Sequence, residues 1–161
     1  MHAFLGGWSY AGIMTSQSGT PFSVENGGYG DSAGVADGTV TNGSFADIVG
    51  NPNSGIPPRD PAQKGPLLFN PNAYTDTRGL TFGDSGRNSL NIPHRTNFDM
   101  SVYKMFQPTE RISVQFRAEA FNIFNHPQWN GVNNFTDTGN FLYPSGAHSG
   151  RIGQFAIRLA F

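Results

Sequence analysis

The chain has 161 residues, and 10 Lys and Arg against 11 Asp and Glu give it a formal net charge of −1. That length suits one domain or part of one. The balanced charge lacks the basic surface that nucleic-acid binding requires, so we expect no nucleic-acid partner. With no cysteine, the chain has no disulfide, thiolate metal site or cysteine nucleophile.

The composition favours an all-β protein. Charged residues make up 13 % of the chain and aromatic residues another 13 %, alongside 21 Gly and 11 Pro. Low charge with many aromatic residues and turn formers is typical of strands joined by loops. No apolar run approaches the roughly 18 residues of a membrane helix.

The first strand is predicted at about residues 2–17, where apolar residues alternate loosely and glycines interrupt them. The segment Met1–Trp8 has neither the cationic start nor the long apolar stretch of a secretory signal. It is patterned like the middle of a strand, so we expect the chain to be a fragment of a longer product.

A long loop is predicted from about 25 to 93, because the periodicity disappears there and Gly, Asn, Asp, Ser and Pro dominate. A connection of this length is rare inside a compact domain. It is therefore a functional loop, a disordered segment or a large extracellular loop.

Alternation returns after about residue 95. Strands are predicted at about 95–106, 110–124 and 150–161, with a short hairpin loop at 106–110 and a second long loop at about 126–149. No amphipathic helix of useful length appears.

Alternating segments of about ten residues, with a short turn on one side and long loops on the other, are typical of outer-membrane β-barrels. Such barrels need at least eight strands, whereas four are predicted here, and lipid cannot satisfy an open sheet edge. The predicted fold class is therefore all-β and antiparallel: four strands of a larger transmembrane barrel, not a closed barrel alone.

The C-terminus resembles the terminal signal by which outer-membrane barrels are recognised by their insertion machinery. The chain ends on an aromatic residue preceded by apolar residues at alternate positions: Phe155, Ile157, Leu159 and Phe161.

An ordered set of further segments resembles the C-terminal barrel region of TonB-dependent receptors, of the Oar-like type with a carboxypeptidase-regulatory-like domain. The resemblance covers essentially the whole chain. The segments are Gly12–Val24, Phe69–Tyr74, Gly86–Leu90, Asn97–Phe106, Gln115–Gln128 and the closing strand.

The resemblance implies the last four strands of a barrel of about 22 strands, in the outer membrane of a Gram-negative bacterium, with the C-terminus in the periplasm. A complete receptor imports a small nutrient with energy passed from TonB to a plug domain. The implied partners are outer-membrane lipid, the rest of the barrel and plug, the TonB complex through that plug, and the insertion machinery. We do not expect the fragment to transport alone.

Two charged residues in the third predicted strand are candidates for the barrel lumen. Arg117 and Glu119 lie mid-strand, where a charge facing lipid costs about 2–4 kcal/mol for Arg. Pairing about Pro108 places Asp99 opposite Arg117 and Asn97 opposite Glu119, with Met100 beside Phe116 and Val102 beside Val114 on the lipid side. We therefore expect an Asp99–Arg117 ion pair, with a structural role favoured over substrate contact.

Motifs that resemble catalytic or metal sites lack the required context. Gly30–Gly34 is a G-x-S-x-G sequence without the strand before and helix after it. Gly83–Gly86 resembles a serine-protease segment, and Gly27–Asp31 resembles one calcium-binding repeat without further copies. The four histidines lack metal-ligand spacing. We expect no catalytic residue, cofactor or metal, and no enzyme.

Several aromatic residues are candidates for the interfacial girdles of a barrel: Trp8, Tyr10, Tyr103, Phe121, Phe124 and Trp129. Aromatic residues can instead bind sugar rings, so the alternative is a soluble secreted β-sandwich that binds carbohydrate or a surface. A self-contained eight-stranded barrel is a third possibility, but it needs four more strands within 25–93.

Overall fold

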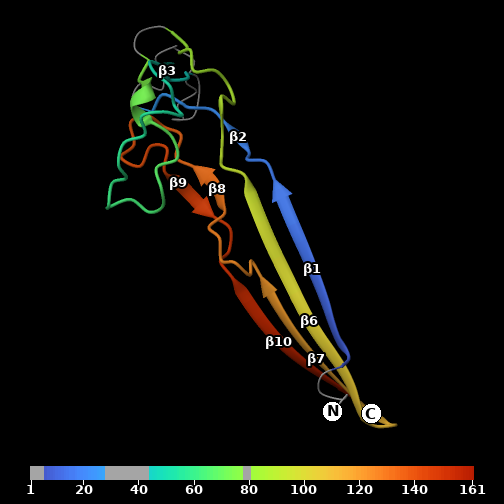
Figure 1. Ribbon diagram of the computed structural model, residues 1–161. Helices are drawn as coiled ribbons and strands as arrows, with labels where there is room; N and C mark the ends of the chain where they lie inside the picture. Colours follow the sequence, from blue (N-terminus) through green and yellow to red (C-terminus); the bar gives the residue numbers. More distant parts are fainter. Residues whose placement is uncertain (1–5, 28–43, 78–80) are drawn as a thin grey trace. The chain divides into compact units, whose positions relative to one another are not determined.

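The computed structural model describes residues 6–27, 44–77 and 81–161 (Figure 1). Apart from the three-residue 3-10 helix η1 (Pro71–Ala73), every regular element in this part of the chain is a β-strand, and every strand pair is antiparallel. The predicted all-β antiparallel fold class is confirmed. The chain divides into a strand unit (Met1–Gln17, Arg95–Gln128 and Ser149–Phe161) and a loop unit (Ser18–His94 and Trp129–His148).

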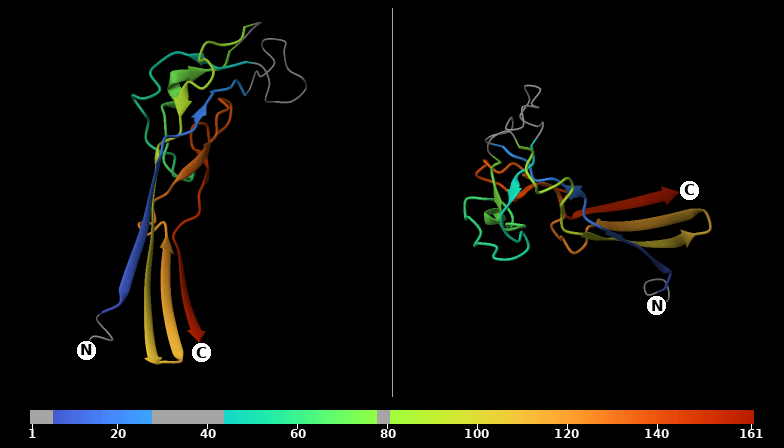
Figure 2. Two further views of the ribbon diagram at one scale, coloured as in Figure 1. Left: turned by 90° about the vertical axis from the view of Figure 1, so that its right-hand side faces the viewer. Right: turned by 90° about the horizontal axis from the view of Figure 1, so that it is seen from above.

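Four long strands make up the strand unit. They are β1 (Trp8–Gln17), β6 (Arg95–Thr109), β7 (Ile112–Phe121) and β10 (Ile152–Ala160), and they form one sheet in the order β1-β6-β7-β10. Figure 2 shows these strands side by side. Neighbours in the sheet follow each other in the sequence, so the strands run up and down. The described strand unit thus has a single sheet, without the second sheet of a β-sandwich.

Both long connections leave the same end of this sheet. The first connection leaves β1 at Gln17 and returns to β6 at Arg95, and these two residues are paired. The second connection leaves β7 at Phe121 and returns to β10 at Ile152, which are also paired. At the opposite end, β6 and β7 are joined by the two residues Glu110 and Arg111. Long connections at one end and a tight turn at the other are what the sequence predicted.

The register predicted between β6 and β7 is wrong by four residues. Arg117 pairs with Tyr103 and not with Asp99. Glu119 pairs with Ser101 and not with Asn97. The strand β6 continues past Pro108 to Thr109, with an irregularity between Phe106 and Thr109, so the hairpin closes with two residues and not five. Met100 and Val102 accordingly pair with Ala120 and Ala118 in place of Phe116 and Val114.

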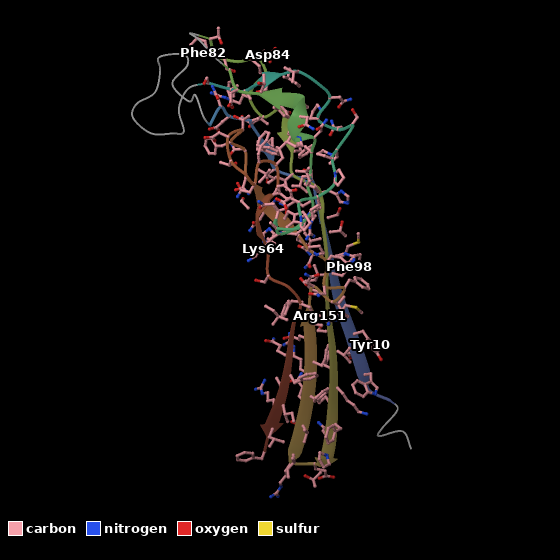
Figure 3. All side chains as sticks on the ribbon, turned by 90° about the vertical axis from the view of Figure 1, so that its left-hand side faces the viewer. Tyr10, Lys64, Phe82, Asp84, Phe98 and Arg151 are labelled. Atoms are coloured by element: carbon pink, nitrogen blue, oxygen red, sulfur yellow. The ribbon has the colours of Figure 1, made fainter. Side chains whose placement is uncertain are left out.

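Because this error is an even number of residues, it leaves the two faces of the sheet unchanged. One face, the apolar face, carries Trp8, Tyr10, Met14, Phe98, Met100, Val102, Lys104, Phe106, Ile112, Val114, Phe116, Phe155, Ile157 and Leu159. The other, the polar face, carries Gln17, Arg95, Asn97, Asp99, Ser101, Gln115, Arg117, Glu119, Gln154 and Arg158. A few apolar residues share this face: Ile13, Tyr103, Met105, Phe121 and Ile152. Figure 3 labels Tyr10 and Phe98 of the apolar face.

The loop unit is built from short antiparallel ladders. They pair β2 (Pro21–Phe22) with β5 (Leu90–Asn91), β3 (Asp47–Ile48) with β4 (Tyr74–Thr75), and β8 (Trp129–Val132) with β9 (Pro144–Ala147). Between 25 and 93 the strands of the described residues are only two residues long. They do not supply the four crossing strands that a self-contained eight-stranded barrel needs.

The loop unit has a hydrophobic core of its own. Its buried members are Val24, Ala46, Phe69, Ala73, Tyr74, Leu90, Phe141 and Leu142, with Phe22, Leu67, Leu68 and Val132 packed around them. Buried Asn26 links two segments, since its amide donates to the Thr77 carbonyl at 2.8 Å and to the Ser44 hydroxyl at 3.3 Å. The described part of the predicted loop 25–93 is therefore a packed structure.

Candidate functional site

The charged side chains in the middle of the polar face form one connected group. The Arg117 guanidinium donates to the Glu119 carboxylate, and the Gln154 amide, from the paired position on β10, donates to the other oxygen of the same carboxylate. Arg117 remains half exposed, whereas the Glu119 side chain is largely covered. The charge on β7 is thus neutralised within its own strand.

Asp99 belongs to a second group at the end of the sheet where the long connections leave. Its Oδ1 accepts from the Asn97 amide at 2.7 Å and from the backbone N–H of Asn122 at 2.9 Å. The Asn97 Oδ1 in turn accepts from the Gln128 amide at 2.9 Å. The predicted Asp99–Arg117 ion pair is therefore wrong: both residues share the polar face, but each binds other partners.

A shallow hollow of about 250 Å³ lies on β1, β6 and β7. Its lining includes Ala11, Ile13, Asp99, Ser101, Arg117 and Glu119. The polar part of this lining offers carboxylate and hydroxyl acceptors beside one guanidinium, and the apolar part comes from Ala11 and Ile13 of β1. Such a surface can hydrogen-bond polar groups of a neighbouring protein segment or of a solute.

Asn122 was not among the candidates from the sequence, although it fixes the end of β7. Its backbone is in the left-handed region, with φ of 50°. Its Oδ1 accepts from the His126 N–H at 3.1 Å, and its Nδ2 donates to the His126 carbonyl at 3.1 Å. Asn tolerates this conformation better than most residues. An asparagine just after an alternating segment is the sequence signal that could have found it.

The loop unit contains a pocket of about 350 Å³ that the sequence did not reveal. It is lined by Pro57, Pro58, Asp60, Leu67, Pro71, Tyr74, Thr136, Thr138, Gly139, Phe141 and Tyr143. The Tyr143 hydroxyl accepts from the Asp60 N–H at 2.8 Å. Tyr74 packs edge-on against Phe141, with ring centroids 6.0 Å apart, and burial raises the pKa of its phenol. The lining residues come from both long connections.

The motifs that resemble catalytic sites fall into two groups. Gly30–Gly34, and Gly27–Asp31 except for its first residue, lie outside the described residues. In the Gly83–Gly86 segment, the Asp84 carboxylate accepts from the Ile48 N–H at 2.7 Å and the buried Ser85 hydroxyl donates to the Val24 carbonyl at 3.3 Å. Asp84 is labelled in Figure 3. The side chains of this segment hold loop-unit backbone.

Among the described residues, no three His, Cys, Asp or Glu side chains cluster in a way that could hold a metal ion. His94, His126 and His148 are exposed, whereas His2 lies outside the described residues. The His126 ring stacks on Phe124, with ring centroids 5.8 Å apart.

The predicted C-terminal signal residues lie along one edge of the sheet. Phe155, Ile157 and Leu159 occupy alternate positions of β10 on the apolar face and are 79 %, 70 % and 63 % exposed. Phe155 stacks on Phe116 of β7, and Phe161 follows the end of the strand.

The aromatic residues expected at the girdles do not share one face. Trp8 and Tyr10 lie on the apolar face, whereas the pairing of Tyr103 and Phe121 places them on the polar face. Phe124 packs edge-on against Phe98 of the apolar face, and Trp129 begins β8 in the loop unit.

Comparison with protein families identifies the family of the chain. Residues 1–154 match a family described as "Outer membrane beta barrel domain". Comparisons with curated proteins and with solved structures found no match. Within the described residues, no helical segment has the length and hydropathy needed to cross a membrane.

Proposed function

This chain belongs to the family of outer membrane β-barrel domains, and from that premise we propose that it supplies four neighbouring strands of a TonB-dependent receptor of the Oar-like type. Family membership places the chain in the outer membrane, in contact with its lipid. The receptor imports a small nutrient and is a transporter, with no enzymatic step of its own.

The observation that carries this proposal is the construction of the strand unit. Four antiparallel strands of 9 to 15 residues present one apolar and one polar face. Strands of this length can cross the hydrocarbon layer when tilted. The apolar face then meets lipid, and the polar face, with Asn97, Asp99, Arg117 and Glu119, meets the lumen and the plug.

The two outer strands of the sheet imply further strands. In the part of the chain that the structure describes, β1 and β10 each have a partner on one side only. Lipid offers no hydrogen bonds to the other side, so a membrane barrel has no open edge. In our proposal the rest of the receptor pairs with both edges, and its plug receives energy from TonB.

We place the loop unit outside the cell and the Glu110–Arg111 turn in the periplasm, together with the C-terminus. Outer-membrane barrels have short periplasmic turns and longer extracellular loops. With this orientation, the loop unit and its pocket beside Tyr74 lie on the side of the membrane from which the nutrient comes.

The first test measures binding to TonB. The protein encoded by the complete reading frame that contains this chain is purified in detergent and mixed with the purified periplasmic domain of TonB. We expect a stable complex with the complete protein and none with residues 1–161 alone. A folded complete protein that does not bind this domain would refute the TonB-dependent function while leaving the barrel intact.

The second test measures orientation. Single cysteines replace Ile56, 44 % exposed in the loop unit, and Glu110 of the turn, in the complete protein. In whole cells we expect a membrane-impermeant maleimide to label position 56, whereas position 110 is labelled only after the cells are opened. The reverse pattern would overturn the orientation.

A further inference from the structure

The pocket of the loop unit is held in shape by the chain itself. Hydrogen bonds join the two long connections around it: the Asp60 N–H donates to the Tyr143 hydroxyl at 2.8 Å, and the Gln63 amide donates to the Gly139 carbonyl at 3.1 Å. The lining also contains three prolines, whose rings fix their φ: Pro57, Pro58 and Pro71. A pocket formed in advance loses little freedom when a ligand binds, which favours affinity.

The Tyr74 hydroxyl has no hydrogen-bond partner among the described residues. Tyr74 lines the pocket and is only 8 % exposed, yet its hydroxyl keeps contact with solvent. The hydroxyl of a buried tyrosine usually finds a partner. A ligand in the pocket can supply the partner that the described protein does not.

Asp60 and Tyr143 supply further hydrogen-bonding groups to the same pocket. The Tyr143 hydroxyl accepts from the Asp60 N–H, which leaves its own proton available to a ligand. The Asp60 Oδ1 accepts from the Ala62 N–H at 2.8 Å, so its Oδ2 remains available. Asp60 is exposed, and a ligand can therefore reach its carboxylate.

The charge of the lining restricts the class of ligand. Asp60 is the only charged residue among the described lining residues. An anionic ligand would therefore meet a carboxylate with no cation to offset it, and like charges placed together are unfavourable. An ammonium ligand could donate to Asp60, but it has no acceptor for the phenol protons of Tyr74 and Tyr143.

A neutral saccharide satisfies both requirements. Each of its hydroxyl groups can donate and accept, so it can serve a carboxylate and two phenols at once. Its C–H groups are apolar, as is the remaining lining by Leu67, Phe141 and the three prolines. The volume of about 350 Å³ lies at the small end of the range of about 300–1,000 Å³ for ligand pockets, which suits a single sugar unit.

We propose that this pocket binds one unit of a neutral saccharide, with its hydroxyl groups on Tyr74, Tyr143 and Asp60 and its C–H groups against the prolines. That this saccharide is the imported nutrient rests on the proposed function. The binding itself does not depend on TonB.

The test uses the complete protein, purified in lauryldimethylamine oxide because detergents with sugar headgroups would compete. It is applied to an array of neutral oligosaccharides of glucose, galactose, mannose and xylose, with matched glycans that contain glucosamine or glucuronic acid, and short peptides. We expect preferential binding to neutral glycans. No binding to any neutral glycan, or a preference for glucuronic acid or for peptides, would overturn the saccharide assignment.

Two variants locate the binding. Tyr74→Phe removes only a hydroxyl, and Asp60→Asn removes the charge but keeps an oxygen for the Ala62 N–H. The control is Tyr10→Phe, which removes a hydroxyl from the apolar face of the strand unit. We expect several-fold weaker binding in the first two variants and unchanged binding in the control. Binding that is unchanged in both pocket variants would overturn the site.

Hydrogen exchange separates a lost contact from a lost fold. Since the Tyr74 hydroxyl has no partner among the described residues, Tyr74→Phe should keep the protection of loop-unit peptides. In the unaltered protein, the neutral glycan bound most strongly on the array should slow exchange in peptides from 57–71 and 136–143. Slower exchange only elsewhere would overturn the site. A protein that binds neutral glycans but not TonB would keep this pocket and refute the proposed import, whereas one that binds TonB but no glycan would do the reverse.

Discussion

At the scale of single residues, the backbone of Glu25 makes hydrogen bonds that hold the loop unit together, whereas its carboxyl is in surroundings that disfavour its ionised form. Its N–H donates to the Asn134 carbonyl at 2.9 Å, and its own carbonyl accepts from the Thr136 N–H at 3.2 Å. Burial raises the pKa of the Glu25 carboxyl, and the hydrogen bond from the Asn134 amide only partly opposes this effect. The loop unit therefore holds an ionised group in surroundings that favour its neutral form.

We predict that Glu25→Gln stabilises the loop unit at neutral pH. A carboxyl whose pKa is higher in the folded state lowers the free energy of unfolding as pH rises from the unfolded pKa through the folded pKa. Glutamine keeps the oxygen that accepts from Asn134 but cannot ionise. Hydrogen exchange of loop-unit peptides, corrected for intrinsic rates, should show slower opening in the variant at pH 7 and no difference at pH 3.

The matched control is Glu110→Gln, which alters an exposed carboxylate in the hairpin turn of the strand unit. It should leave exchange in the loop unit unchanged at both pH values. A Glu25→Gln variant that opens faster at pH 7 would show that the ionised carboxylate stabilises this site.

Leu142 is fully buried in the loop core and adopts a left-handed backbone conformation, with φ of 61°. Two backbone hydrogen bonds hold it there: its N–H donates to the Asn133 carbonyl, and its carbonyl accepts from the Leu68 N–H. Surrounding structure must hold a non-glycine residue in this region of φ. Leu142 is thus an anchor between the two connections that form the loop unit.

We expect Leu142→Ala to lower the free energy of unfolding of the loop unit by about 2–5 kcal/mol, since it leaves a cavity and retains the strained Cβ. Leu68→Ala is the comparison, because Leu68 is only half-buried against the same core and should cost less. The urea dependence of hydrogen exchange in the two variants gives both losses in the free energy of unfolding. Equal losses would show that Leu142 is no special anchor.

At the scale of elements, the alternation of apolar and polar residues predicted the long strands and the side chains on each of their faces. The strict alternation of 111–120 requires apolar residues on one face of β7, and the same pattern in the closing strand produces β10. Register depends on the turn, which alternation does not specify. Pro108 suggested a loop, but β6 accommodates it at an irregularity, as proline in strands often requires.

The loop unit was not predictable for a related reason. Its ladders are two to four residues long, too short to produce a periodic signal. Its core residues come from separate stretches of the chain: Val24, Phe69 and Leu142 lie more than 40 residues apart in sequence, yet belong to one cluster. Their contacts are tertiary, and the glycine- and asparagine-rich sequence around them has no periodic pattern that would predict these contacts.

Cysteine cross-linking can distinguish the two registers of the β6–β7 hairpin. Tyr103 and Arg117 are paired, so their Cβ atoms should be about 4.5–5.5 Å apart, close enough for a disulfide. Asp99 and Arg117 are offset by four residues, or about 13 Å. We predict efficient oxidation of the 103/117 cysteine pair and little of the 99/117 pair. Efficient formation of the 99/117 disulfide would restore the register expected from the sequence.

At the scale of the whole molecule, the apolar face needs a membrane to cover it and the outer strands need partners. Phe155, Ile157 and Leu159 are exposed in the chain as described, so their hydrophobic surface becomes favourable only in lipid. Assembly into the membrane is therefore part of folding for this protein, and residues at the end of β10 can affect it without contributing to any core.

Phe161 is the terminal aromatic residue that we expect the insertion machinery to recognise. It is fully exposed and follows the final strand, so Phe161→Ala removes little packing. If the insertion machinery reads the terminal aromatic residue, the variant of the complete protein should show a several-fold decrease in folded barrel, measured as the heat-modifiable band in outer-membrane fractions. Phe82→Ala is the control, since Phe82 is 60 % exposed and lies away from the terminus. Equal losses in the two variants would indicate a general effect of aromatic surface, and no loss in Phe161→Ala would show that the terminal residue is not read.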